Sequence, residues 1–127
     1  MDKAALVSRY LLGAIYLFFG INFFAGFVQP PPPTPEGGAF LGALFATGYM
    51  FPFIKITEIV VGLSLLSNKF TALAMVIIAP VSLNIFLYHA ILDPSAQGLF
   101  VPVLIIVASL VYVKSIMPKY SALLSAN

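Results

Sequence analysis

Hydrophobic and polar residues alternate along this chain in long blocks. Apolar blocks cover residues 5–28, 51–66, 70–92 and 98–116, and short polar or proline-rich segments separate them. An α-helix of about 20 apolar residues crosses a hydrocarbon core of roughly 30 Å and satisfies its own backbone polar groups. The pattern therefore predicts an all-α integral membrane protein, with four transmembrane helices in a single membrane domain over residues 1–127.

Two further segments lie between the first and second predicted spans. Residues 29–38 place five prolines within six positions, which predicts an extended outer loop. Residues 39–50 are apolar but reach only about 18 Å as a helix, too short to cross the membrane. They predict a short re-entrant or interfacial helix, with one long kinked helix continuing into the second span as the alternative. Small residues recur here every fourth position and suggest a face for close helix contact with the bundle or a partner: Gly38, Gly42 and Ala46.

The composition supports a membrane environment and excludes several classes of protein. Hydrophobic residues make up 61% of the chain and charged residues 8%, too few to cover a water-soluble fold. There is no Cys and only one His, which excludes disulfides, thiolate metal sites and bis-histidine haem. No nucleophile–base pair suggests a stand-alone hydrolase, so catalytic residues are unknown and no metal is expected. The basic residues form no stripe of the kind that binds nucleic acid.

The basic residues do predict an orientation. The loops on one side of the four spans carry only Glu36 and Asp93 as charged residues, whereas nearly all of the basic residues fall on the other side: Lys3, Arg9, Lys69, Lys114 and Lys119. The positive-inside rule then predicts a bacterial-type inner-membrane protein with both termini in the cytoplasm.

Two ionisable residues inside the second span are the main candidates for function. Lys55 and Glu58 are three residues apart, so they share a helix face and are expected to pair near the outer side of the membrane. Each charge costs about 2.5–3.5 kcal/mol near the bilayer centre, which makes the pair unusual in so apolar a chain. Asn84 and Tyr88 share a face of the third span and complete the predicted core of a polar cluster. Asn22 and His89 are expected as secondary members.

Residue spacing alone does not decide which polar side chains of the third span join this cluster. Ser82, His89 and Asp93 share a different face of the third span, nearly opposite to that of Asn84, and a kink at Pro80 would be needed to rotate the two together. Intramembrane polar residues also serve as simple hydrogen-bonding contacts between helices, worth about 0.6–2 kcal/mol each. A purely structural role for the Lys55–Glu58 pair is therefore the alternative to a ligand-binding or proton-linked one.

Three stretches of the chain together resemble the DoxX family of small four-span bacterial membrane proteins. The stretches are residues 9–13 with Phe19-Gly20, residues 53–58 with Gly62, and residues 79–84 with Tyr88, His89 and Asp93. The resemblance covers about residues 5–117. It implies a role beside a quinone or in a membrane redox complex, because the family includes proteins similar to the small subunit of a thiosulfate:quinone oxidoreductase. It also implies that Lys55, Glu58, Asn84 and His89 are the family's polar positions.

Two functions follow as hypotheses. The first is an accessory subunit of a membrane redox or respiratory complex, whose polar cluster binds the head group of a quinone-type lipophilic ligand. The second is a structural or assembly subunit without a ligand, which contacts other membrane subunits or further copies of itself through the proline-rich loop and the small-residue face. A small transporter or channel is a weaker option, since four short spans enclose little lumen.

Overall fold

A computed structural model describes residues 2–126, and this part of the chain consists of helices joined by turns and one longer loop. The elements are, in order, α1 (Lys3–Ala25), α2 (Pro35–Ala46), α3 (Met50–Ser67), α4 (Thr71–Leu87), the π-helical turn η1 (Tyr88–Leu92), α5 (Ala96–Ser115) and the 3-10 turn η2 (Met117–Tyr120). Within the described residues, four helical segments are long and apolar enough to cross a membrane: Lys3–Ala25, Met50–Ser67, Thr71–Leu92 and Ala96–Ser115. The predicted all-α membrane fold is confirmed.

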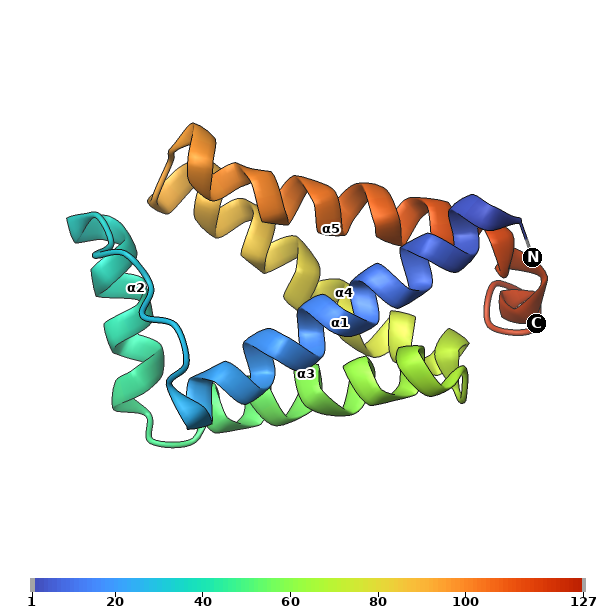
Figure 1. Ribbon diagram of the computed structural model, residues 1–127, viewed down its shortest axis with the longest axis horizontal. Coiled ribbons are helices and arrows are strands. Elements are labelled where there is room, and N and C mark those ends of the chain that lie inside the picture. Colours follow the sequence, from blue (N-terminus) through green and yellow to red (C-terminus); the bar gives the residue numbers. More distant parts are fainter. Residues whose placement is uncertain (1, 127) are drawn as a thin grey trace.

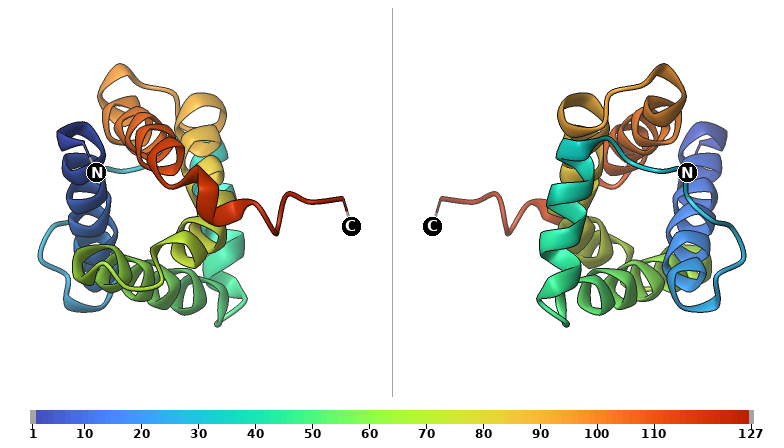
Figure 2. Two further views of the ribbon diagram at one scale, coloured as in Figure 1. Left: turned by 90° about the vertical axis from the view of Figure 1, so that its right-hand side faces the viewer. Right: turned by 90° about the vertical axis from the view of Figure 1, so that its left-hand side faces the viewer.

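The four long helices form an up-and-down bundle. Helix α1 packs against α3 and α5, and α4 packs against the same two neighbours, so α1 and α4 occupy diagonal positions (Figures 1 and 2). Both chain termini and the α3–α4 turn lie at one end, which we call the terminal end. Helix α2 lies at the opposite end, which we call the α2 end.

Three glycines allow α1 and α3 to approach closely. A Cβ atom added at Gly62 would lie 2.7 Å from the backbone nitrogen of Leu17 and 2.9 Å from the carbonyl oxygen of Gly13. A Cβ atom at Gly20 would lie 2.6 Å from Ile59 Cγ1 and 2.9 Å from the Lys55 carbonyl oxygen. These distances are shorter than van der Waals contact, so only glycine fits. Such backbone contact replaces the hydrophobic driving force that is missing between helices in lipid.

Helix α2 runs across the α2 end of the bundle rather than along it (Figure 1). It is separate from α3, because the chain turns at Gly48 with a φ of 79°, and this excludes the alternative of one long kinked helix. The helix begins earlier than the predicted residue 39, and the proline-rich loop therefore ends before residue 38. The reason is local: the Thr34 side chain accepts a hydrogen bond from Gly37 N, and Pro35 occupies the first helical turn, where it needs no hydrogen-bond partner.

Thr34 attaches the loop and α2 to the segment that joins α4 to α5. Its hydroxyl donates to the Leu92 carbonyl oxygen at 2.6 Å, and its backbone N–H lies 3.4 Å from Asp93 Oδ1. The Phe40 ring packs on Tyr88 with ring centres 6.1 Å apart, and at its other end α2 contacts α3 through Phe45 and Phe51. Helix α2 thus bridges α3 and η1.

Proline 80 does not interrupt α4, which continues through it to Leu87. The departure from α-helical geometry comes later, in η1, where the Asp93 N–H bonds to the Tyr88 carbonyl five residues back. A π-turn of this kind inserts an extra residue into the helical repeat. It changes which side chains share a face after Tyr88, so spacing alone could not place His89.

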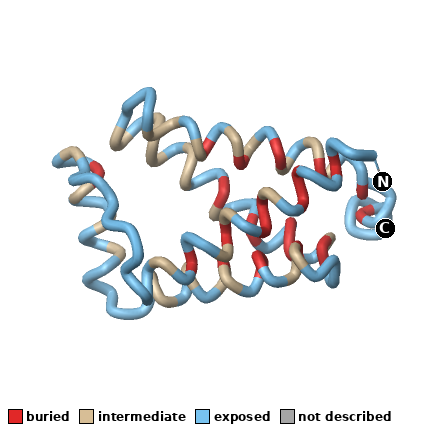
Figure 3. Tube along the Cα trace, in the orientation of Figure 1, coloured by how far each residue is buried: buried red, intermediate tan, exposed pale blue. Residues whose placement is uncertain are grey.

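The buried core occupies the half of the bundle nearer the terminal end (Figure 3). Its apolar part is built by residues such as Leu12, Leu65, Ile78 and Ile105, each at most 2% exposed. In the other half, most side chains of the long helices are partly or fully exposed, and Gly37 is the only buried residue of α2. The bundle is therefore tightly packed at one end and more open at the other.

Candidate functional site

Lys55 and Glu58 form the ion pair that their spacing predicts. Lys55 Nζ lies 3.0 Å from Glu58 Oε2, and this is the sole ion pair among residues 2–126. The Glu58 side chain is 3% exposed and that of Lys55 is 20% exposed. Glu58 lies eight residues after the start of α3 and nine before its end, about 12 Å from its N-terminal end. It therefore lies near the middle of the span, and Lys55 lies one turn nearer to the N-terminal end of α3.

The hydrogen bonding of the Glu58 carboxylate is incomplete. The Lys55 ammonium, 3.0 Å from the enclosed Oε2, is its sole donor, and no other residue within residues 2–126 donates a hydrogen bond to either carboxylate oxygen. A buried carboxylate with a single donor is costly, because its two oxygens have lost several hydrogen bonds to water and gained one partner in return. The pair therefore has capacity for another donor, either a proton or a polar group of a ligand.

Two further polar side chains lie at the same level of the bundle. The Tyr16 hydroxyl of α1 and the Ser82 hydroxyl of α4 are hydrogen-bonded to each other, and both residues are at least 95% buried. The bond connects the two diagonal helices across the bundle centre. Glu58 is near enough to interact electrostatically with the Tyr16 hydroxyl. We call Tyr16, Glu58 and Ser82 the central polar layer.

This layer marks the boundary between the packed half of the bundle and the open half. Glu58 is the first buried residue of α3, and Ser82 is the last buried residue of α4. In α1 only Gly20 is buried beyond Tyr16. Lys55 lies one turn further toward the α2 end, where it is partly exposed.

The other predicted members of the cluster lie elsewhere. Asn84 is exposed, and its Nδ2 donates to the Pro80 carbonyl one turn earlier on the same helix. Tyr88 packs against α2, with its hydroxyl 2.7 Å from where a Cβ of Gly37 would stand. Across residues 2–126, no hydrogen bond or ion pair joins either side chain to Lys55 or Glu58.

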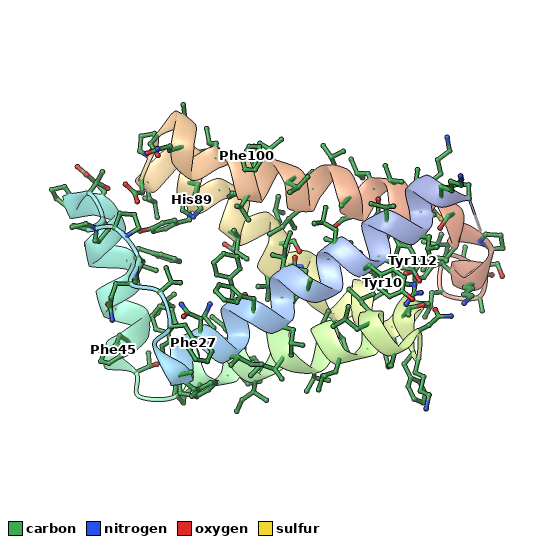
Figure 4. All side chains as sticks on the ribbon, viewed as in Figure 1. Tyr10, Phe27, Phe45, His89, Phe100 and Tyr112 are labelled. Carbon is green, nitrogen blue, oxygen red and sulfur yellow. The ribbon has the colours of Figure 1, made fainter. Side chains whose placement is uncertain are left out.

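The His89 side chain, which belongs to η1, packs toward the start of α5 (Figure 4). Its ring packs edge-on against Tyr88 with centres 4.9 Å apart. Its Nδ1 is enclosed without a partner in the described chain and faces Gly98, where an added Cβ would stand 3.1 Å away. The contacts of His89 are thus with the helix end rather than with the Lys55–Glu58 pair.

Asn22 has a structural role at the end of α1. Its amide Nδ2 donates to the Val28 carbonyl at 3.0 Å, and its Oδ1 accepts from the Val28 N–H at 2.8 Å. The Asn22 carbonyl oxygen also accepts from Gly26, which adopts a φ of 70° and ends the helix. Because both ends of the amide are engaged, Asn22 holds the start of the proline-rich loop and has little to offer a ligand.

The small-residue face of α2 packs against little else in the described chain. A Cβ at Gly42 would meet no atom within 4 Å, and one at Gly38 would meet only Pro33 at 3.5 Å. Ala46 is exposed, and its neighbour Phe45 is 67% exposed. The close helix contact that the sequence suggested for this face is made instead by α1 and α3.

A groove of about 450 Å³ runs between α3 and α4 on the outside of the bundle. Its walls are almost wholly apolar and include Phe53, Thr57, Val60, Val61, Leu73 and Ile77. Thr57 and Val61 flank Glu58 along α3, so the groove passes beside the ion pair without including it. Its shape and lining suit an alkyl or isoprenoid chain.

Comparisons with protein-family models, with curated proteins and with solved structures gave no match. The resemblance to the DoxX family therefore stays a prediction from the residues quoted above. Sequence reasoning missed Tyr16 as a site residue and left Ser82 outside the predicted core of the cluster. Tyr16 stands in an unbroken apolar block, and Ser82 lies on the face opposite to Asn84, so neither spacing nor composition distinguished them.

Proposed function

We propose that this protein is a DoxX-like accessory subunit of a membrane redox complex, and that it binds the head group of a quinone-type lipophilic ligand beside the central polar layer. The observation that carries the proposal is the Glu58 carboxylate, which is buried at mid-span with the Lys55 ammonium as its sole donor within the described chain. A purely structural ion pair would be expected to satisfy both oxygens.

The chemistry of a quinone matches the groups present. Its carbonyl oxygens accept hydrogen bonds, and the Lys55 ammonium is a partly exposed donor on the side of the open half. Reduction of a quinone to a quinol adds two electrons and two protons. Glu58 is placed to pass protons to a head group at Lys55, while the electrons come from a redox-active subunit of the complex. The isoprenoid tail would lie along apolar surface such as the α3–α4 groove.

The charge distribution supports an orientation. Lys3, Lys69, Lys114 and Lys119 lie at or beyond the helix ends at the terminal end, whereas Glu36 and Asp93 lie at the α2 end. By the positive-inside rule the terminal end faces the cytoplasm of a bacterial inner membrane. The open half of the bundle, with Lys55, then faces the outer leaflet.

The test is a binding titration with a decyl-substituted benzoquinone on the purified protein in neutral-lipid nanodiscs. We expect Glu58→Gln and Lys55→Met each to weaken binding about 10-fold or more, since a hydrogen bond to a charged group contributes about 1.5–3 kcal/mol. Glu36→Gln is the matched control, because Glu36 is an exposed carboxylate on α2. Circular dichroism of each variant verifies folding. Unchanged affinity in both folded pair variants would refute the proposal.

A second candidate function, a structural or assembly subunit, is favoured by one separate observation. The face of α2 with Gly38, Gly42 and Ala46 is uncovered in the single chain, with open space around Gly42. Under this function Gly42→Leu should abolish co-purification of the partner subunits from host membranes, while Glu58→Gln leaves the assembly intact. Normal assembly of the Gly42→Leu variant would contradict it.

A further inference from the structure

A second buried polar group lies at the terminal end, in the half of the bundle away from Lys55 and Glu58. The Arg9 side chain of α1 is only 4% exposed. Its Nη1 donates to the carbonyl oxygen of Leu65 on α3, and its guanidinium carbon stands 4.4 Å from the centre of the Tyr10 ring. Arginines near a span end ordinarily extend toward water. Arg9 instead turns inward onto the backbone of a neighbouring helix.

The charge of Arg9 has no counter-ion in the described part of the chain. The ion pair at Glu58 is seven residues from Leu65 along α3, about 10 Å away. The Asp2 carboxylate at the same end accepts a hydrogen bond from Ala5 N at the start of α1. Arg9 Nε is enclosed and unpartnered, and Nη2 makes no hydrogen bond within residues 2–126. A buried guanidinium without a counter-ion is strongly unfavourable, so an anion from outside the chain would stabilise it.

A hydroxyl donor is available in the same region. Tyr112 of α5, a helix that packs on α1, is fully buried, and its hydroxyl has no partner in the described chain. Figure 4 shows Tyr10 and Tyr112 at the terminal end of the bundle. Burial raises the pKa of the nearby Tyr120 hydroxyl, and Tyr112 adds to the rise. The Tyr120 hydroxyl is already used, since it donates to the Ala72 carbonyl at 3.0 Å.

We propose that Arg9 and Tyr112 bind the phosphate group of an anionic phospholipid at the terminal end. A guanidinium and a hydroxyl offer the donors that a phosphate oxygen accepts, and guanidinium fits phosphate with two parallel bonds. The depth is that of a lipid head group, because Leu65 is two residues from the end of α3. Three further lysines at the terminal end, Lys3, Lys69 and Lys114, favour an anionic lipid over a neutral one. This inference does not depend on the quinone proposal.

Native mass spectrometry tests the inference with protein delipidated in detergent and then exposed to phosphatidylglycerol or phosphatidylcholine. We expect the wild type to retain phosphatidylglycerol about 10-fold more strongly than phosphatidylcholine. Arg9→Gln should remove most of that preference, and Tyr112→Phe should reduce it without disturbing packing. Lys119→Gln is the matched control, because it removes an exposed charge at the same end and should change retention little.

A thermal-unfolding measurement makes the result independent of any folding defect in Arg9→Gln. Phosphatidylglycerol in mixed micelles should raise the unfolding temperature of the wild type and of Lys119→Gln, but not that of Arg9→Gln or Arg9→Met. Equal retention by the wild type and both site variants would overturn the proposal, as would equal retention of the two lipids by the wild type. Protection by inorganic phosphate in place of lipid would overturn the lipid assignment and identify a free phosphate as the ligand.

Discussion

The contact between α1 and α3 makes a quantitative prediction about Gly62. Replacing it with alanine places a Cβ 2.7 Å from the Leu17 nitrogen and 2.9 Å from the Gly13 carbonyl oxygen, whereas ordinary contact begins at 3.4 Å. Both neighbours are backbone atoms, so no side chain can rotate away, and the helices must separate by roughly 0.5 Å or more. Overpacking of this kind costs about 1–3 kcal/mol. The higher helix propensity of alanine offsets about 1 kcal/mol of this, so we expect a net loss of up to about 2 kcal/mol.

The assay is unfolding in mixed micelles by titration with sodium dodecyl sulfate, followed by circular dichroism. Gly42→Ala is the control, because its Cβ meets nothing within 4 Å and it should be neutral or slightly stabilising. Gly13→Ala should cost less than Gly62→Ala, since its closest neighbours are the movable side-chain atoms of Leu66 at 2.8 and 2.9 Å. If Gly62→Ala is as stable as Gly42→Ala, the close contact of α1 with α3 is not what holds the bundle together.

Two other perturbations address the polar contacts. Tyr16→Phe should destabilise the protein by about 1 kcal/mol in the same titration, because it leaves the Ser82 hydroxyl without its partner on α1. If the two hydroxyls are partners, the double variant with Ser82→Ala should lose less than the sum of the two single losses, and a strictly additive loss would contradict the pairing. Thr34→Val removes both the cap of α2 and the bond to Leu92, so hydrogen exchange in residues 35–40 should rise several-fold. Unchanged exchange there would show that α2 is held by its aromatic contacts with Tyr88 and Phe51 instead.

The spans and much of the local structure follow from the sequence because they depend on short-range physics. An uninterrupted apolar block must become a helix in lipid, whatever its neighbours are. The predicted span limits agree with the structure within about three residues, as expected for boundaries judged from composition. The Lys55–Glu58 pair also followed from spacing, since residues three apart on a helix always share a face. The start of α2 was missed, although Thr34 and Pro35 are an ordinary helix-start signal within a run of prolines.

Only the tertiary structure decided which helices are neighbours and which polar groups meet. The close helix contact is made by Gly13, Gly20 and Gly62 rather than by the small residues of α2. Which small residues make such a contact depends on which helices lie side by side. A small-residue pattern indicates that another helix can approach closely, but it does not identify which helix does. The same reason explains why Asn84 carries a local bond while Ser82 meets Tyr16 across the bundle.

Arg9 shows most clearly what could not be predicted from the sequence alone. In the sequence it is a positive charge near a span end, and that is enough to predict the orientation of the protein. In the fold its guanidinium is enclosed against Leu65, a residue far along the chain. Hydropathy and charge act along the chain and set how it crosses the membrane. Burial, hydrogen-bond partners and unbalanced charge arise only where separate helices come together, so the candidate sites became visible only in the packed bundle.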